Sequence, residues 1–460
     1  MQTLLDPRAS PLPGLCLAGI VAVALLYFGQ PSQLVVTAAC SVLCIAWWVF
    51  EPIPIPVTSL LPLALMPLFG VLTPAETGEA YGSPLILLLL GGFLLSRGME
   101  STGAHRRIAL GVVRLVGGGS PRRIVMGFMV AGSLLSMWIS NTATVLMLVP
   151  VALAILESSS DRKRLAVPLL LGLAWACSIG GLGTPIGTPP NLVFMQVYEE
   201  FTGETVGFAR WMSIGIPVVV IMVPVTALWL TRDLPHDIKI QVPEVGEWRS
   251  AEKRVLTLFG LTALAWITRS EPFGGWRDLL GLNTANDASV AFIAVIALFV
   301  LRDKDRKPLI TWQQAVDIPW GVLLLFAGGI CLAKAFVTSG LSTIAGESLV
   351  ALTTLPIYWM MLVICLAVTF MTEATSNTAT TALLMPILAS AAIAAGIDPL
   401  LLMVPAALSA SCAFMLPVAT APNAVVFGTG EVKISQMVHE GFVLNVLGAF
   451  LISGLMWLLL

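Results

Sequence analysis

The string SNTAT occurs twice in the 460-residue chain, at Ser140–Thr144 and at Ser376–Thr380. Each copy lies inside a long apolar stretch, and each is followed by a Gly/Pro-broken segment that ends in Pro-Asn, at Asn191 and at Asn423. Hydroxyl and amide groups are costly to place inside an apolar span, and they mark functional sites there. Two copies in two halves of the chain predict two halves of one binding site.

The chemistry that these residues offer is neutral and rich in oxygen. A broken helix adds unpaired N–H groups, which favour a carboxylate, and unpaired C=O groups, which favour a hard cation. The predicted site holds no Lys or Arg, so a bound anion needs another positive charge, and Na⁺ is the simplest candidate. The candidate Na⁺ ligands are Ser136, Ser140, Asn141 and the backbone near Gly187 in the first half, and Thr372, Asn377 and the backbone near Thr375 and Ala419 in the second.

Two equivalent polar tips that meet at a pseudo-two-fold axis suit a ligand with two carboxylates a short distance apart. Succinate, fumarate and malate have that shape, and the sequence does not rank them. Protonation of the ligand would remove the charge that the site binds. We therefore expect transport of the dianion, driven by more than one Na⁺.

The elements that position these tips are expected to be helices in a membrane. The chain is 57% hydrophobic and only 11% charged, and apolar runs of spanning length recur along it, which is typical of a polytopic all-α membrane protein. The predicted transmembrane helices number 11, near 14–29, 34–50, 55–72, 83–104, 167–198, 210–231, 254–270, 287–301, 319–338, 400–429 and 440–460.

Two further apolar segments, 123–157 and 357–395, do not fit as simple crossings. Basic residues flank 123–157 at both ends, which places both ends on the cytoplasmic side and predicts a re-entrant hairpin with its tip near Ser140. Acidic residues, Glu347 and Asp398, flank 357–395, which predicts the same hairpin entering from outside. In this topology 19 of the 24 Lys and Arg residues are cytoplasmic, the amino terminus is inside and the carboxyl terminus is external.

Because the flanking charges invert between the hairpins, the two halves are predicted to form an inverted-topology repeat. That architecture is typical of secondary transporters, which bind substrate at the repeat interface near the middle of the membrane. The predicted units are a first repeat at 1–230 with hairpin 123–157 and unwound segment 180–191, a cytoplasmic connector at 231–253, and a second repeat at 254–460 with hairpin 357–395 and unwound segment 416–430.

The motifs around the tips are WISNTAT and TSNTATTALLMP, and those of the broken segments are GTPIGTPPN and LPVATAPNAVVFGTG. Together they resemble the motifs of the divalent-anion:sodium symporter family, in particular its bacterial dicarboxylate members, over essentially the whole chain. The resemblance implies that each SNT binds one substrate carboxylate and contributes to a sodium site. The implied substrate ligands are Ser140, Asn141 and Thr142 on one side and Ser376, Asn377 and Thr378 on the other, with Thr188 and Thr420 lining the same cavity.

The resemblance also implies an assembly and a mechanism. It implies a homodimer in the inner membrane of a bacterium, and an elevator in which a transport domain carrying both hairpins slides against a dimerised scaffold. No cofactor is expected besides Na⁺ as the coupling ion, and no nucleic acid is expected as a partner.

Alternative functions and roles are left open by the sequence. A sodium-independent dicarboxylate exchanger could use the same fold, and a passive anion channel is a more distant alternative. An enzyme is not expected, because no HExxH motif is present and no His lies near either SNT.

Glu373 lies beside the second tip where the first half has Met137, and it could pair with a basic group, orient the tip or bind sodium. Arg97 and Lys334 are repeat-equivalent, and anchoring is the simpler role for both.

Overall fold

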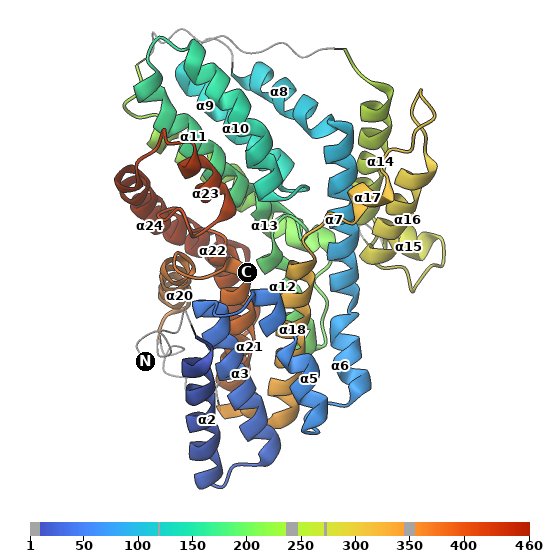
Figure 1. Cartoon of the computed structure of the whole chain (residues 1–460), viewed down its shortest axis with the longest axis vertical. Coiled ribbons are helices and arrows are strands. Elements are labelled where there is room, and N and C mark those ends of the chain that lie inside the picture. Colours follow the sequence, from blue (N-terminus) through green and yellow to red (C-terminus); the bar gives the residue numbers. More distant parts are fainter. Residues whose placement is uncertain (1–9, 118–119, 236–246, 271–273, 345–354) are drawn as a thin grey trace.

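The structure is a computed structural model that describes the chain except for residues 1–9, 118–119, 236–246, 271–273 and 345–354. The described residues form helices and connecting loops, with one isolated β-bridge between Arg302 and Pro308 (Figure 1). The prediction of an all-α protein is therefore confirmed for the described part of the chain. Residues 236–246 of the connector 231–253, and the flanking Glu347, lie outside the described residues.

The first half of the chain contains twelve α-helices and one 3₁₀ turn among its described residues. They are α2 (Leu12–Tyr27), α3 (Ser32–Phe50), α4 (Ile55–Thr58), α5 (Leu61–Leu68), α6 (Pro74–Tyr81), α7 (Pro84–Thr102), α8 (Ala104–Val116), α9 (Pro121–Ser136), α10 (Asn141–Ser158), α11 (Arg162–Gly180), the turn η1 (Gly181–Gly183), α12 (Pro189–Thr202) and α13 (Phe208–Leu230).

The second half contains ten α-helices among its described residues. Its described helices are α14 (Ser250–Ile267), α15 (Gly275–Leu279), α16 (Asp287–Val300), α17 (Trp312–Ala315), α18 (Trp320–Ser339), α20 (Ile357–Thr372), α21 (Asn377–Ala395), α22 (Leu400–Ala410), α23 (Ala421–Gly428) and α24 (Ile434–Leu459).

Eight helices among the described residues are long and apolar enough to cross a membrane. A number of shorter apolar helices accompany them, so the length criterion alone does not reproduce the predicted count of 11, which stays a prediction. The eight are Ser32–Phe50, Pro74–Thr102, Asn141–Ser158, Arg162–Gly183, Phe208–Leu230, Trp320–Ser339, Asn377–Ala395 and Ile434–Leu459.

The helix boundaries follow local signals that the two halves share. Helix α7 begins after Ser83, whose hydroxyl accepts from the backbone N–H of Ile86 at 3.3 Å, with Pro84 in its first turn. It ends at Gly103, which has φ +75°. The repeat-equivalent Gly340 ends α18 with φ +76°. Only a residue without Cβ adopts this left-handed conformation at little cost, so a glycine is needed at both ends.

The repeat-equivalent basic residues each pair with an acid on a neighbouring element. Arg97 on α7 reaches Asp317, between α17 and α18, at 2.7 Å, and Lys334 on α18 reaches Glu79 on α6 at 2.8 Å. These ion pairs tie together elements that pack side by side, and the role as interfacial anchors or helix caps that the sequence favours for both residues stays a prediction.

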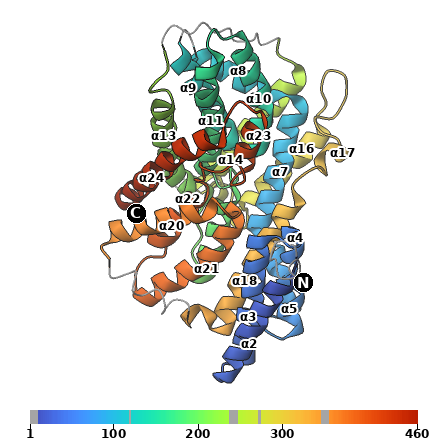
Figure 2. The same ribbon diagram turned by 60° about the vertical axis from the view of Figure 1, so that its left-hand side comes forward.

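Each SNT motif stands at a break between two helices. The first break covers residues 137–140, between α9 and α10, and the second covers 373–376, between α20 and α21. The two helix pairs lie toward opposite ends of the molecule in both views (Figures 1 and 2). The outer limits of the second pair are Ile357 and Ala395, the limits that the apolar pattern predicts.

The two later breaks differ from the predicted unwound segments. The first covers 181–188, with η1 inside it, rather than 180–191, because Pro189 and Pro190 already stand in the first turn of α12. The second covers 411–420 rather than 416–430. Residues 421–428 form helix α23 instead, because the hydroxyl of Thr420 caps it by accepting from the N–H of Asn423 at 3.2 Å.

The helices that follow these breaks cross over between the halves. Helix α12 of the first half packs against α21 of the second half, and α23 of the second half packs against α10 of the first. Helix α11 lies beneath α9 and is almost fully buried. This exchange brings both SNT breaks and both later breaks to one place.

Candidate functional site

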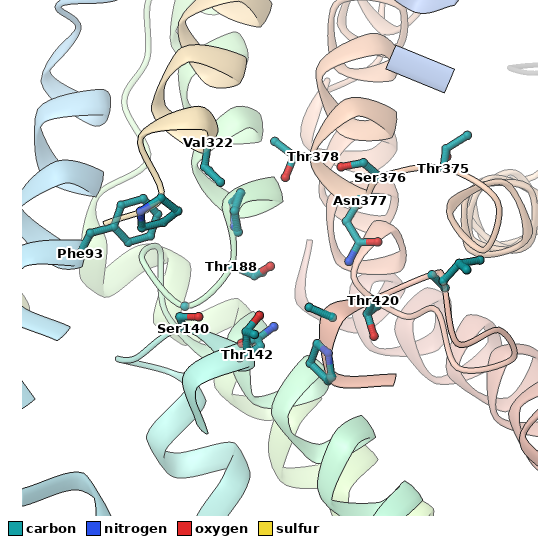
Figure 3. Close-up of a pocket in the computed structure, with 18 of the residues that line it drawn as sticks. Phe93, Ser140, Thr142, Thr188, Val322, Thr375, Ser376, Asn377, Thr378 and Thr420 are labelled. Carbon is teal, nitrogen blue, oxygen red and sulfur yellow. The ribbon is translucent and has the colours of Figure 1, made fainter. Parts of the chain in front are cut away.

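A cavity of about 650 Å³ lies where the four breaks meet (Figure 3). The predicted residues from both halves line it together, although the two SNT motifs are more than two hundred residues apart in the chain. Those lining it are Ser140, Asn141, Thr142, Gly187, Thr188, Thr375, Ser376, Asn377, Thr378, Ala419 and Thr420. The two others, Ser136 and Thr372, are fully buried directly behind the tips.

The first tip gathers oxygen atoms around a glycine. The hydroxyl of Ser136 donates to Oδ1 of Asn141. A Cβ placed on Gly181 would lie 3.1 Å from Oδ1 of Asn141 and 3.1 Å from the carbonyl oxygen of Gly187. Because Gly181 has no side chain, these two oxygens face a space that a larger residue would fill. Neutral oxygens around a small space fit a hard cation such as Na⁺.

The second tip repeats the pattern with different residues. The hydroxyl of Thr372 lies within hydrogen-bond distance of Oδ1 of Asn377, at 2.8 Å, and of the carbonyl oxygen of Ala410, at 2.9 Å. The hydroxyl of Thr375 contacts Met371 O at 2.9 Å and the hydroxyl of Thr380 at 2.6 Å. Since these contacts turn the Thr375 hydroxyl away, its backbone carbonyl is the better candidate ligand, as the sequence predicts.

Both tips also place a helix amino terminus at the cavity. Helices α10 and α21 begin at Asn141 and Asn377, and the N–H groups of a first helical turn lack partners within the helix. Ser140 caps α10 by accepting from Ala143 N–H at 3.4 Å, whereas Ser376 makes no such side-chain bond. Helix amino termini bind anions, so each tip can hold one carboxylate.

Asn191 and Asn423 hold the two later breaks together. The side-chain amide of Asn191 donates to the carbonyls of Gly181 at 2.9 Å and Thr184 at 2.8 Å. Asn423 does the same to Ala413 at 3.1 Å and Leu416 at 3.0 Å. Sequence reasoning uses the Pro-Asn pairs only as repeat markers and misses this role, although their fixed distance from the breaks is a signal. The Oδ1 atom of each Asn is buried and has no donor among the described residues.

The opposite wall of the cavity comes from α3, α7 and α18, and it is mostly apolar. Phe93 and Val322 face the tips across the cavity (Figure 3). Glu51 is the only ionisable residue among the described residues that line the cavity. It caps the end of α3 with φ 51°, a left-handed conformation that is uncommon for a residue other than Gly, Asn or Asp. Sequence reasoning gives no signal for Glu51.

An aromatic cluster supports the first tip from the side. Trp138, inside the first break, stacks near Phe208 with ring centroids 6.1 Å apart and meets Phe259 of α14 edge to face at 5.4 Å. Trp266 of α14 lies parallel to Trp138 at 6.4 Å. Aromatic pairs at these distances contribute to packing beyond the area that they bury.

Comparisons with known proteins give one family. A family model described as "Citrate transporter" matches residues 45–406. The chain is 39% identical to the protein named "Sodium-dependent dicarboxylate transporter SdcS" of Staphylococcus aureus strain bovine RF122 / ET3-1, over 96% of this chain and 90% of that protein. The same figures hold for the proteins of that name from strains MSSA476 and MW2.

Two solved transporters share the fold at low sequence identity. The YdaH transporter of Alcanivorax borkumensis matches with a TM-score of 0.59 at 17% identity, covering 84% of this chain and 87% of that one. MtrF of Neisseria gonorrhoeae matches with a TM-score of 0.56 at 13% identity, covering 83% and 82%. These two likenesses concern the arrangement of helices alone.

Proposed function

Because this chain matches the citrate transporter family model and belongs with the divalent-anion:sodium symporters, we propose that it imports C4-dicarboxylates together with Na⁺. Like the other members of its family, it is an integral membrane transporter and not an enzyme. The similarity to proteins named sodium-dependent dicarboxylate transporters, over nearly the full length of both, supports the choice of ion and substrate class.

The charge of the cavity carries this proposal. The described residues that line it include no Lys, Arg or His, and the one ionisable residue among them is the acid Glu51. A dianion bound in such a cavity would meet no positive side chain, and an uncompensated charge is costly away from water. The oxygen clusters behind Asn141 and Asn377 offer places for Na⁺ to supply the missing charge. This requirement for a cation favours sodium coupling over sodium-independent exchange.

The decisive experiment is uptake of labelled succinate into proteoliposomes that contain the purified protein. We expect uptake with an inward Na⁺ gradient and a fall to the level of protein-free vesicles when K⁺ or choline replaces Na⁺. Unlabelled fumarate and malate should compete, and citrate serves as the comparison because the family model carries that name. Undiminished uptake in K⁺ would contradict sodium coupling and would favour the exchanger.

We further propose that the pairs α9–α10 and α20–α21 are re-entrant hairpins that enter from opposite faces of the membrane. The amino terminus would then be cytoplasmic and the carboxyl terminus external, in the inner membrane of a bacterium. The placement of the two pairs toward opposite ends of the molecule supports this topology (Figure 2).

Labelling of single cysteines tests the topology. A membrane-impermeant maleimide needs only Cys16 replaced as background, because the other six cysteines are buried. We expect Arg123→Cys and Lys163→Cys, at the two ends of the first pair, to react only from the cytoplasmic side. Leu355→Cys and Asp398→Cys should react only from the outside. Reaction of the two ends of one pair from opposite sides would mean that the pair crosses the membrane.

The elevator and the homodimer also stay proposals. The apolar wall from α3, α7 and α18 faces both tips, which suits a scaffold against which a body carrying the tips could slide. A detergent-corrected mass of a single chain in solution would argue against the dimer.

A further inference from the structure

Glu373 is a buried carboxylate at the second tip, where the first half has no charge. It follows the last residue of α20 and lies three positions before Ser376, the first residue of the SNT motif. Its side chain is 5% exposed, and the repeat-equivalent residue in the first half is Met137. An acid inside an apolar span is costly, so it needs a function that a methionine does not serve.

The carboxylate of Glu373 is held by four hydrogen-bond donors. Oε1 accepts from the backbone N–H groups of Phe414 at 2.7 Å and Met415 at 2.8 Å, and Oε2 accepts from that of Leu416 at 2.9 Å. The side-chain amide of Asn445, on α24, donates to Oε1 at 2.7 Å. Consecutive backbone N–H groups of this kind form an anion-binding nest, and here the anion is part of the chain. All four contacts donate, which matches an ionised carboxylate, since that group only accepts.

No cation balances this carboxylate in the described part of the chain. None of the ion pairs found there includes Glu373, although buried carboxylates are normally paired with a base. The hydrogen bonds stabilise the charge but do not cancel it. The alternative in which Glu373 pairs with a basic group is therefore not supported by the described residues, and the alternative in which it orients the tip is supported by its contacts.

In the first half, the break at 137–140 and the later break at 181–188 are joined by a hydrogen bond between neutral groups. There the hydroxyl of Thr184 donates to the carbonyl of Met137, and the indole N–H of Trp211 donates to the carbonyl of Leu182 at 2.9 Å. Residues Gly181–Gly183 keep a 3₁₀ turn, so that break stays partly wound. The corresponding residues of the second half are not helical, and their N–H groups bind Glu373 instead. The two half-sites therefore differ in electrostatics although they share a geometry.

We propose that Glu373 is a positioning residue that makes the second half-site the stronger of two unequal sodium sites. Its hydrogen bonds fix the segment that carries Ala419 against the turn that carries Thr375 and Asn377. Its negative charge stands two residues before Thr375 and four before Asn377 in the chain, and it attracts a cation to these oxygens without binding it directly. A Na⁺ bound there would balance the negative charge of Glu373, so the bound ion and the ionised Glu373 stabilise each other. The inference rests on the proposed sodium-coupled function.

Glu373→Gln tests the role of the charge, because it keeps the shape of the side chain and removes the ionised group. In proteoliposomes we expect the Na⁺ concentration for half-maximal succinate uptake to rise by about tenfold, since the neutral amide no longer attracts the ion. The KM for succinate at saturating Na⁺ should change by less than about threefold, because the substrate ligands are untouched. Glu373→Asp, which keeps the charge, should recover part of the sodium affinity.

Two controls separate this role from a structural one. Glu431 is a carboxylate of the same half that does not line the cavity and that pairs with Arg162 of the first half. The substitution Glu431→Gln should therefore leave the sodium dependence unchanged. A purely structural role for Glu373 predicts less folded protein or a lower maximal rate with an unchanged sodium requirement, and that result would overturn the proposal.

A second variant keeps the test decisive if Glu373→Gln does not fold. Asn445→Ala removes one donor to the carboxylate and should raise the sodium requirement by about threefold. An unchanged requirement would then contradict the proposal. The increase in melting temperature that Na⁺ causes in detergent should shrink in parallel, which measures ion binding without transport. If Na⁺ affects neither uptake nor melting of the unmodified protein, the proposed function fails rather than the role of Glu373.

Discussion

Asn141→Ala and Asn377→Ala are each expected to reduce sodium-driven succinate uptake by roughly 100-fold or more. Each change removes the amide oxygen that faces the candidate cation position. Each also leaves a buried hydroxyl, of Ser136 or Thr372, without its acceptor at the tip. Because the proposed site needs both half-sites to bind one dianion with its sodium ions, loss at either tip should suffice. Initial rates in proteoliposomes measure the effect, normalised to the amount of reconstituted protein.

The controls for this pair address folding and site assignment. Asn283→Ala, in an exposed loop outside the cavity, should transport at the normal rate. Both tip variants should elute at the same volume as the unmodified protein in size-exclusion chromatography. Normal uptake and sodium dependence in either tip variant would mean that its tip does not bind the transported species.

Gly187→Ala is expected to reduce uptake by roughly 100-fold as well, through backbone geometry rather than lost chemistry. A Cβ at this position would lie 2.5 Å from the carbonyl oxygen of Gly181 and 3.0 Å from its Cα. Backbone atoms cannot yield as a flexible side chain can, so the break must open. Opening would displace the Gly187 carbonyl from Oδ1 of Asn141 and strain the bond from Asn191 to Gly181. Initial uptake rates and the sodium-induced shift in melting temperature should both fall.

Gly207→Ala is the matched control for this substitution. It makes the same chemical change at a glycine around which a Cβ would meet nothing within 4 Å, so uptake should stay normal. The equivalent of Gly187 in the second half is Ala419, so a methyl group fits at the corresponding place in that half. If Gly187→Ala also behaves normally, the first break does not need its present close packing.

The sequence predicts local features well where two independent signals agree. Apolar length and flanking charge together place the helix pair at 357–395, and the structure has its outer ends at the same residues. The break between two helices at each SNT can also be predicted from the sequence, because Ser and Asn favour helix starts over helix interiors. The second later break is placed less well, at 416–430 instead of 411–420. The motif LPVATAPN looks irregular throughout, but its Pro422 stands in the first turn of a helix.

The sequence by itself determines the type of protein, the repeat, the two polar tips and the absence of basic residues from them. Composition and hydrophobic pattern decide these features, because each depends on residues close together in the chain. Only the tertiary structure decides that α12 packs on α21 and α23 on α10, which brings the four breaks into one cavity. It also decides that Glu373 meets the N–H groups of a segment about forty residues away. Such contacts satisfy buried backbone groups across the fold, and no local pattern specifies which distant group will serve as partner.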